Sequence, residues 1–482
     1  MTEAGALGDM PPEEFQRQVH RVAEWMTGYL QTVESLPVLS RVEPGDLLHG
    51  LPPSPPQAGE AMEAILEDFQ ELVVPGITHW NHPGFLGYFA ITGSGPGVLA
   101  EMLAAALNVN AMLWRTSPAG TELEQRVVAW MLELLGLPPH FMGVIQDTAS
   151  SSSLAALAGA RHRAYPESRE SGLFGLPRGR VYASQEAHSS IDKAVMALGL
   201  GKAGLRRIEV DSEYQMRPGA LEKAIQEDRA AGIRPVAVVA TLGTTSTASC
   251  DPVAEILPIV REHGMWLHVD AAYGGAAAML GELSHLFKGW EEADSVVVNP
   301  HKWLFTPVDC SLLFLSDGDS VRDALSLTPE YLRTAEGTEV LNLMDYGVPL
   351  GRRFRALKLW FVLRYFGARG LQSRIRGHID LAKRLAELVG GSPHWDVVAP
   401  VHFSTVVLRW SPPAVSRDEC DALGMELMER VNRQGEVFLS HTRLEPGVCI
   451  RVSVGNLRTE WRHLERAWDL LQEGAAALAP GV

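Results

Sequence analysis

The sequence has little cysteine and no cysteine clusters. Its 482 residues include four cysteines, and no two of them form a Cys-x-x-Cys pair. Structural zinc sites and disulfide frameworks both need cysteines at short, regular spacings. Both classes are therefore excluded for Cys250, Cys310, Cys420 and Cys449, and no metal site is expected.

Positive charge is scarce, and no long uninterrupted apolar run is present. Lys and Arg number 42 against 58 Asp and Glu, a net charge of −16. Such a chain binds a phosphate backbone poorly, so a nucleic-acid partner is excluded. The longest apolar stretch, 97–114, is broken by Glu101, Asn108 and Asn110, which predicts a buried helix and no membrane contact. The first residues lack a basic region followed by an apolar run, so a cytoplasmic location is expected.

The composition is that of a large globular protein. Hydrophobic residues make up 46% and charged residues 21% of the chain. At this length two or three domains are expected. We predict a helical N-terminal segment over 1–94 that wraps around a partner subunit, a large α/β domain over 95–357 and a small α+β domain over 358–482.

The two ends of the chain carry the patterns behind this division. Residues 12–36 repeat apolar side chains at helical spacing, and a proline-rich linker follows at 52–56. Near residue 350 the pattern changes to long helical stretches and then to strand-like runs (355–366 and 371–389; 402–408 and 448–453).

In the middle, short apolar runs rich in β-branched residues alternate with helical segments. This alternation predicts a mainly parallel sheet covered by helices on both faces. In such sheets, ligands bind at the carboxyl ends of the strands. Polar residues follow several of the runs, which places a site there: Asp147, His188, Thr241 to Thr245, Asp270, and Asn299 to Lys302.

One lysine and one aspartate indicate the chemistry. The chain has only seven lysines; Lys302 lies in Asn-Pro-His-Lys-Trp, and Asp270 ends an apolar strand 32 residues earlier. A lysine amine forms a Schiff base with an aldehyde, and a carboxylate keeps a pyridine nitrogen protonated, as pyridoxal phosphate chemistry requires. Singly, Lys302 could be a lysine packed along a tryptophan and Asp270 a helix cap. Together they predict pyridoxal 5′-phosphate as cofactor.

Other residues fit the phosphate and the ring. Residues 147–153 supply hydroxyl groups and a helix start, the usual setting for a phosphate, although a serine-rich helix cap explains them equally well. The loop lacks the Walker pattern, which argues against a nucleotide. His188 could stack on a pyridine ring or cap a helix, and His301 could hold the phosphate or tune Lys302.

The chain resembles the group II pyridoxal-phosphate decarboxylases, and among them the aromatic-L-amino-acid decarboxylases. The resemblance runs almost end to end. Its longest matching segments are 75–80, 117–124, 268–273, 299–303 and 349–355. It implies the PLP-dependent transferase fold (fold type I), an amino acid carboxy-lyase activity, and a homodimer with active sites at the subunit interface.

The resemblance also implies residue roles. Lys302 would form the internal aldimine, Asp270 would pair with the pyridinium, and His188 would stack on the ring. Tyr331 matches the tyrosine of the family's mobile catalytic loop and, with His188, would return a proton to the quinonoid carbanion that forms when carbon dioxide leaves. The remaining cofactor contacts would come from Ala149, Ser150, Thr245, Ala272, Asn299 and His301.

Five positions match the family's substrate pocket. Trp80 and Tyr88 are retained as aromatic walls. Ile91 stands where the mammalian-type enzyme has a threonine that contacts a catechol, and Met112 stands where it has a phenylalanine. Gly351 occupies a position at which, in plant relatives, glycine accompanies indolic substrates. Tryptophan-like or phenylalanine-like substrates are therefore favoured over dopa, within an aromatic class that also includes tyrosine.

Two kinds of alternative stay open. On the same cofactor, the product could be an aromatic aldehyde, or the substrate could be non-aromatic, as in glutamate decarboxylases. Tyr331 and His188 argue against the first, and Trp80 and Tyr88 argue against the second. A catalytically silent scaffold would have no need for Lys302, Asp270 and His188 together.

Overall fold

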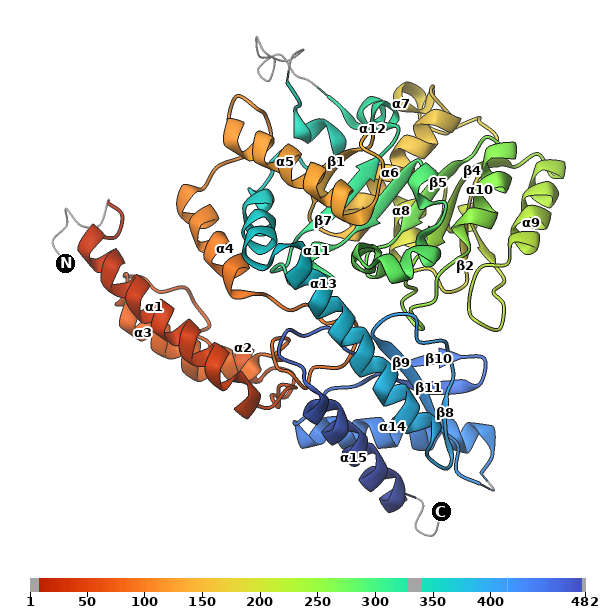
Figure 1. The fold of residues 1–482 in the computed structure, drawn as a ribbon. Coiled ribbons are helices and arrows are strands. Elements are labelled where there is room, and N and C mark those ends of the chain that lie inside the picture. The colour runs from red at the N-terminus through yellow and green to blue at the C-terminus, as the bar shows by residue number, and fades with distance from the viewer. Residues whose placement is uncertain (1–7, 328–339, 414, 479–482) are drawn as a thin grey trace.

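The computed structural model describes residues 8–327, 340–413 and 415–478. A seven-stranded sheet forms the centre of its larger part (Figure 1). Six of the strands are parallel to one another and β7 alone runs antiparallel to both of its neighbours. In sheet order the strands are β1 (Met142–Gln146), β7 (Ser311–Leu315), β6 (Ser295–Val298), β5 (Trp266–Asp270), β4 (Arg234–Thr241), β2 (Gly179–Ser184) and β3 (Leu205–Ile208).

Helices cover both faces of this sheet, because its central strands are apolar on both sides. Strand β5 is buried throughout; Leu267 and Val269 belong to one hydrophobic cluster and Trp266 to the other. The first cluster includes residues of α5 (Pro118–Leu135), α9 (Pro218–Ala230), α10 (Val253–Glu262) and α13 (Arg355–Gly390). The second includes residues of α6 (Ala149–Ala164), α8 (Ser190–Ala197) and α12 (Gly318–Leu325). The predicted mainly parallel, doubly covered sheet is confirmed.

A smaller sheet forms the C-terminal part. Its order is β10 (Ser440–Leu444), β11 (Gly447–Ser453), β9 (Thr405–Trp410) and β8 (Trp395–Val397), all antiparallel. Helices α14 (Arg417–Gln434) and α15 (Trp461–Leu478) pack on it through a third hydrophobic cluster. Helix α14 begins with a capping box formed by Ser416 and Glu419.

Helix α13 connects the two parts, and Figure 1 shows it running from the large sheet down to the small one. Gly367 breaks it with a positive φ of 64°. The domain boundary predicted at 357/358 falls within this helix, so the division of the chain into three domains stays a prediction.

The N-terminal helices project away from the main body as an arm (Figure 1). They are α1 (Pro12–Thr32), α2 (Asp46–Gly50) and α3 (Met62–Asp68), followed by α4 (Gly95–Leu107) on the flank of the large part. Among the described helices, none has the length and apolar content needed to cross a membrane.

Candidate active site

Side chains from five strand ends converge on one cavity of about 190 Å³. Asp270 ends β5, Thr241 ends β4, and α6 begins just after β1. Strand β6 is followed by the short helix α11 (Pro300–Trp303), which carries Lys302. All nine residues expected to bind the cofactor line this cavity, together with six others: Phe89, Thr148, Ala149, Ser150, His188, Ser190, Thr241, Gly243, Thr245, Asp270, Ala272, Tyr273, Asn299, His301 and Lys302.

Lys302 is held as a readily deprotonated amine. Burial lowers the pKa of its ammonium group, and the nearby Arg451 cation lowers it further, against the opposing pull of Asp270. Its Nζ lies 5.1 Å from the centre of the Phe89 ring. A lowered pKa enlarges the neutral fraction of the amine, and only the neutral amine attacks an aldehyde.

His188 lies at the same cavity as a neutral ring with an assignable tautomer. The Ser190 backbone N–H donates to its Nδ1 at 3.1 Å, so Nδ1 is an acceptor and Nε2 carries the proton. Burial lowers the pKa of His188, although the Asp270 carboxylate opposes the shift. The Asp270 carboxylate is oriented by the Ala272 N–H, which donates to Oδ1 at 3.1 Å.

The opposite end of the cavity suits a phosphate. Helix α6 begins at Ala149, and the first N–H groups of a helix have no partner within that helix. The Cys310 N–H donates to His301 Nδ1 at 2.9 Å, and burial lowers the pKa of His301 to about 4, so this ring is neutral.

Two buried polar atoms at the cavity lack a partner within the described part of the chain. They are Asn299 Oδ1 and Thr241 Oγ1. Buried polar atoms are nearly always hydrogen-bonded, so these two indicate that a polar ligand completes the site. Together with the lysine, the aspartate and the helix start, they fit pyridoxal 5′-phosphate.

Sequence reasoning missed a column of stacked groups behind Lys302. The guanidinium of Arg451, from β11, lies 4.4 Å from the centre of the Phe89 ring, and Phe89 stacks on Tyr273 at 3.8 Å. Tyr273 stacks in turn on Trp303 at 4.8 Å. Arg451 also donates to the carbonyls of Tyr88 and Ser246. The only signal in the sequence was an arginine inside an otherwise apolar strand.

Arg451 has further binding capacity. It is 3% exposed, and its Nη2 has no partner in the described structure. Burial lowers the pKa of Arg451 to about 10, which still leaves it charged at neutral pH.

The five expected substrate residues form two separate pairs and one isolated position. Trp80 and Tyr88 stack at 6.0 Å, and Tyr88 is 55% exposed. Met112 Sδ accepts from Asn110 Nδ2, and a Cβ at Gly351 would lie 3.8 Å from the same nitrogen. Ile91 is half-buried. None of the five lines the cavity, and Tyr331 lies outside the described residues.

Comparison with known proteins gives consistent matches over the whole chain. The family model described as "Pyridoxal-dependent decarboxylase conserved domain" matches residues 44–411. Tryptophan decarboxylase 2 of Oryza sativa subsp. japonica is 39% identical, over 97% of this chain and 96% of the relative. Phenylacetaldehyde synthase of Arabidopsis thaliana is also 39% identical, over 98% of both chains. The crystal structure of Oryza sativa TDC with PLP and tryptamine superposes with a TM-score of 0.95 and 35% identity, covering 98% of this chain and 99% of that one.

Proposed function

The chain belongs to the pyridoxal-dependent decarboxylase family, and from this premise we propose that it decarboxylates an aromatic L-amino acid to the amine and CO₂. The observation that carries the proposal is the convergence of Lys302, Asp270 and a helix start on one cavity. The aromatic substrate is supported by the printed names of the relatives and by the tryptamine in the rice structure. Trp80 and Tyr88 stack on each other but do not line the cavity of their own chain, so they would contribute aromatic walls to a site only across a subunit interface.

Bound pyridoxal phosphate supplies a protonated pyridine ring that withdraws electrons from the bond being broken. We assign Asp270 to hold the proton on the ring nitrogen, because a carboxylate stabilises that positive charge. Lys302 would hold the cofactor through its side-chain amine and would give way to the amine of the substrate. His188, whose proton lies on Nε2, would stack on the ring. The start of α6, with Ser150, and the amide of Asn299 hold the phosphate region.

Arg451 is a buried cation close to Lys302, although it does not itself line the cavity. Its side chain is buried and charged, and its Nη2 has no hydrogen-bond partner among the residues that the structure describes. The Arg451 guanidinium donates to the carbonyls of Tyr88 and Ser246 and lies over the Phe89 ring. These three contacts hold the guanidinium in one orientation.

An aldehyde product is the competing outcome, because phenylacetaldehyde synthase is 39% identical to this chain. We retain Tyr331 as the residue that decides between the two, since it is expected to return the proton that gives the amine. The Tyr331→Phe variant is expected to shift the product from amine toward aldehyde. An unchanged amine yield in this variant would count against the role of Tyr331.

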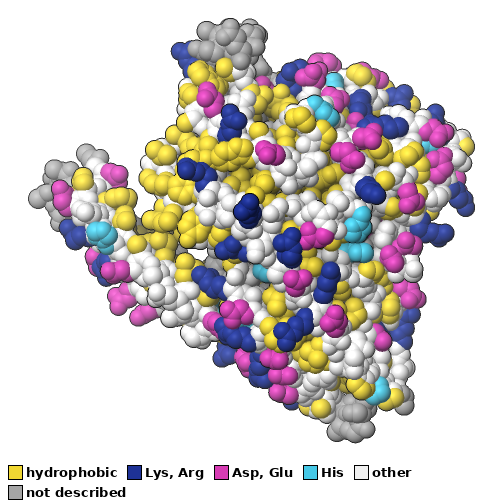
Figure 2. All heavy atoms as spheres, in the orientation of Figure 1, with side chains coloured by type: hydrophobic (Ala, Val, Ile, Leu, Met, Phe, Trp, Pro, Cys, Tyr) yellow, Lys and Arg dark blue, Asp and Glu magenta, His cyan; other side chains and the backbone are white. Residues whose placement is uncertain are grey.

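We also propose that the active unit is a homodimer. Leu99, Leu103 and Leu107 recur every four residues on α4 and are 57%, 48% and 59% exposed. Leu99 lines an apolar groove with Trp360 and Tyr365, and Figure 2 shows a wide hydrophobic surface on this side of the molecule. Contiguous apolar area of this kind marks an interface. A second copy seated here would also supply the substrate residues that lie away from the cavity within one chain.

Product analysis tests the enzymatic proposal. The wild-type protein with pyridoxal phosphate is given tryptophan, phenylalanine, tyrosine, dopa and glutamate, and amine, aldehyde and CO₂ are quantified. We expect amine from aromatic substrates, with tryptophan or phenylalanine preferred. Lys302→Ala should lose the cofactor absorbance band and amine release, whereas Lys383→Ala, at an exposed position on α13, should keep both. Amine release by Lys302→Ala at the wild-type rate, or amine from glutamate alone, would contradict the proposal.

Sedimentation tests the dimer. Leu103→Glu places a charge in the α4 stripe and should shift the protein toward the monomer. Phe174→Glu changes a side chain that is 99% exposed elsewhere and should leave the dimer intact. A monomeric wild-type protein would overturn this assignment. A cytoplasmic location stays a prediction; it is supported by four free, buried cysteines, which suit a reducing compartment.

A further inference from the structure

Strand β5 presents three polar or amphipathic side chains to α6. Residues at alternate positions of a strand share a face, so Trp266, His268 and Asp270 point the same way. Trp266 belongs to the hydrophobic cluster that contains α6. Asp270 at the end of β5 and Ala149 at the start of α6 both line the cofactor cavity. The distance between the two ends of the cofactor site therefore depends on where α6 lies along β5.

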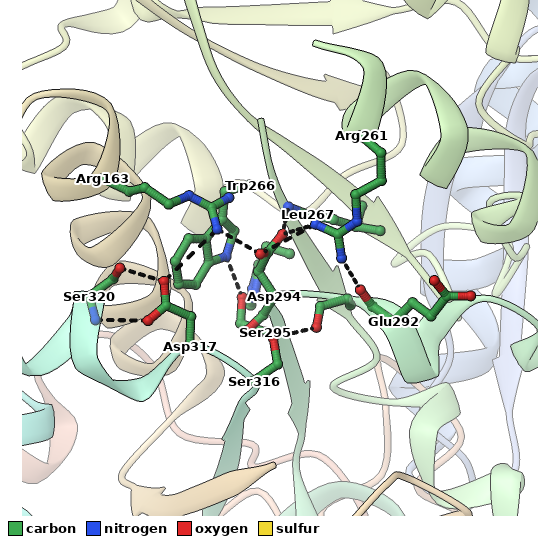
Figure 3. Close-up of polar contacts among 12 residues, drawn as sticks. Arg163, Arg261, Trp266, Leu267, Glu292, Asp294, Ser295, Ser316, Asp317 and Ser320 are labelled. Carbon is green, nitrogen blue, oxygen red and sulfur yellow. Dashed lines mark hydrogen bonds and ion pairs between the residues drawn. The ribbon is translucent and has the colours of Figure 1, made fainter. Parts of the chain in front are cut away.

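The far end of α6 is attached to the start of β5 through Arg163 (Figure 3). Its guanidinium lies 4.6 Å from the centre of the Trp266 ring, and its Nη1 donates to Asp294 Oδ1 at 2.7 Å. Asp294 also accepts the Leu267 backbone N–H at 2.7 Å, so this carboxylate is tied to β5 itself. Cation–π contacts with tryptophan and buried ion pairs are directional attachments.

The near end of α6 is attached through a chain of buried hydrogen bonds. The Trp266 indole N–H donates to Ser295 Oγ at 2.7 Å. Ser295 Oγ lies 2.8 Å from His268 Nδ1, and His268 Nε2 lies 2.9 Å from Ser153 Oγ. All four side chains are fully buried. Ser153 lies four residues after Ala149, and side chains at this spacing share one face of a helix.

The direction of this chain of hydrogen bonds follows from its donors. An indole nitrogen can only donate, so Ser295 Oγ accepts from Trp266, and the Ser295 hydroxyl hydrogen is available to donate to His268 Nδ1. In the tautomer that accepts at Nδ1, His268 carries its hydrogen on Nε2 and donates to Ser153 Oγ. Burial lowers the pKa of His268 to about 4, so the ring is neutral at physiological pH and can accept at one nitrogen while it donates at the other.

We infer that Arg163, Trp266, Ser295, His268 and Ser153 form a closed circuit that fixes α6 along β5 and so sets the separation between the phosphate end and the ring-nitrogen end of the cofactor site. The inference rests on the proposed roles of α6 and Asp270. His268 acts here as a positioning residue that touches neither cofactor nor substrate. When the hydrogen bond between His268 and Ser153 is removed, the N-terminus of α6 is free to move relative to Asp270.

Cofactor affinity of the purified apoprotein tests this role. Ser153→Ala and His268→Asn both remove the link to α6, the second because an asparagine amide replaces Nδ1 but does not reach Ser153. Each should raise the Kd for pyridoxal phosphate about tenfold, the effect of roughly one buried hydrogen bond. The double variant should bind no more weakly than either single one. His268→Gln, whose amide reaches the position of Nε2, should recover most of the affinity.

Tyr182→Phe is the matched control. It removes a buried hydrogen bond to Asp228 from the same sheet, away from α6, and should lower the melting temperature while leaving the Kd unchanged. Unchanged cofactor affinity in Ser153→Ala, additive losses in the double variant, or no recovery in His268→Gln would overturn the inference. A wild-type protein that binds the cofactor without using Lys302 would instead overturn the proposed site.

Discussion

At the scale of single residues, burial sets the protonation state of the groups that face the cofactor cavity. The pKa values of Lys302, His188 and His301 are all lowered, and loss of contact with water is the largest cause in each case. Burial therefore favours the neutral forms of Lys302, the expected nucleophile, and of His188, the expected ring partner. Arg451 adds a second positive charge, which reinforces the shift of Lys302.

Arg451 therefore has a predictable effect on the pH dependence of cofactor capture. Arg451→Gln removes a cation beside Lys302, so the pKa of the Lys302 amine rises. The pH dependence of the rate at which the apoprotein forms its cofactor absorbance band should therefore shift to higher pH. At neutral pH this rate should fall by up to about tenfold, since one pKa unit corresponds to a tenfold change in the neutral fraction. Stopped-flow absorbance between pH 6 and 9 measures it. Arg451→Lys keeps the charge and should keep the wild-type profile; identical profiles for Gln and wild type would exclude the effect.

At the scale of elements, local sequence was sufficient wherever a site residue follows a strand. Asp270, Thr245, Asn299 and Lys302 were found this way, because the ends of parallel strands meet at one edge of the sheet. Arg451 and Phe89 were missed because they approach Lys302 through packing between segments that are far apart in the sequence. No residue spacing in the sequence indicates such a contact.

Two helix glycines should respond in opposite directions to the same substitution. A Cβ at Gly159 of α6 would lie 2.6 Å from Val321 Cγ2 and 3.2 Å from the Val321 backbone nitrogen, so Gly159→Ala should push α12 away. Overpacking of this kind costs about 1–3 kcal/mol. Gly377 of α13 has no atom within 4 Å of its would-be Cβ, so Gly377→Ala should stabilise the protein by about 0.5–1 kcal/mol. Chemical denaturation of both variants checks the signs; a stabilising Gly159→Ala would show that α6 and α12 are packed more loosely than described.

At the scale of the whole molecule, buried histidines couple stability to pH. His268, His301 and His378 each have a pKa lowered to about 4, with burial as the largest cause. Between the ordinary value of 6.5 and about 4, only the unfolded chain takes up these protons. Above pH 6.5 these histidines therefore do not lower the free energy of unfolding. As the pH falls from 6.5 toward 4, the free energy of unfolding decreases.

Acid sensitivity should fall when one of these histidines is removed. Each contributes up to about 1.4 kcal/mol per pH unit to the slope of the unfolding free energy. His378→Asn keeps an acceptor for the Trp303 indole N–H, which donates to His378 Nδ1 at 3.0 Å, but cannot be protonated. The free energy of unfolding of this variant is measured in denaturant at pH 7, 6 and 5. It should decrease with falling pH less steeply than that of the wild type, by the slope that corresponds to about one bound proton. Parallel declines would mean that His378 is protonated in the folded protein.

The column of Arg451, Phe89, Tyr273 and Trp303 has a mechanical consequence. It starts on the small sheet and ends next to the reactive lysine, and the same arginine is bonded to the backbone at Tyr88 and Ser246. A hinge motion of the C-terminal part would separate the Arg451 guanidinium from the Phe89 ring. It would leave a buried positive charge without its contacts, which is energetically costly. The large part and the C-terminal part should therefore move as one rigid body. Substrate entry and closure of the site must then depend on a motion other than a hinge between these two parts.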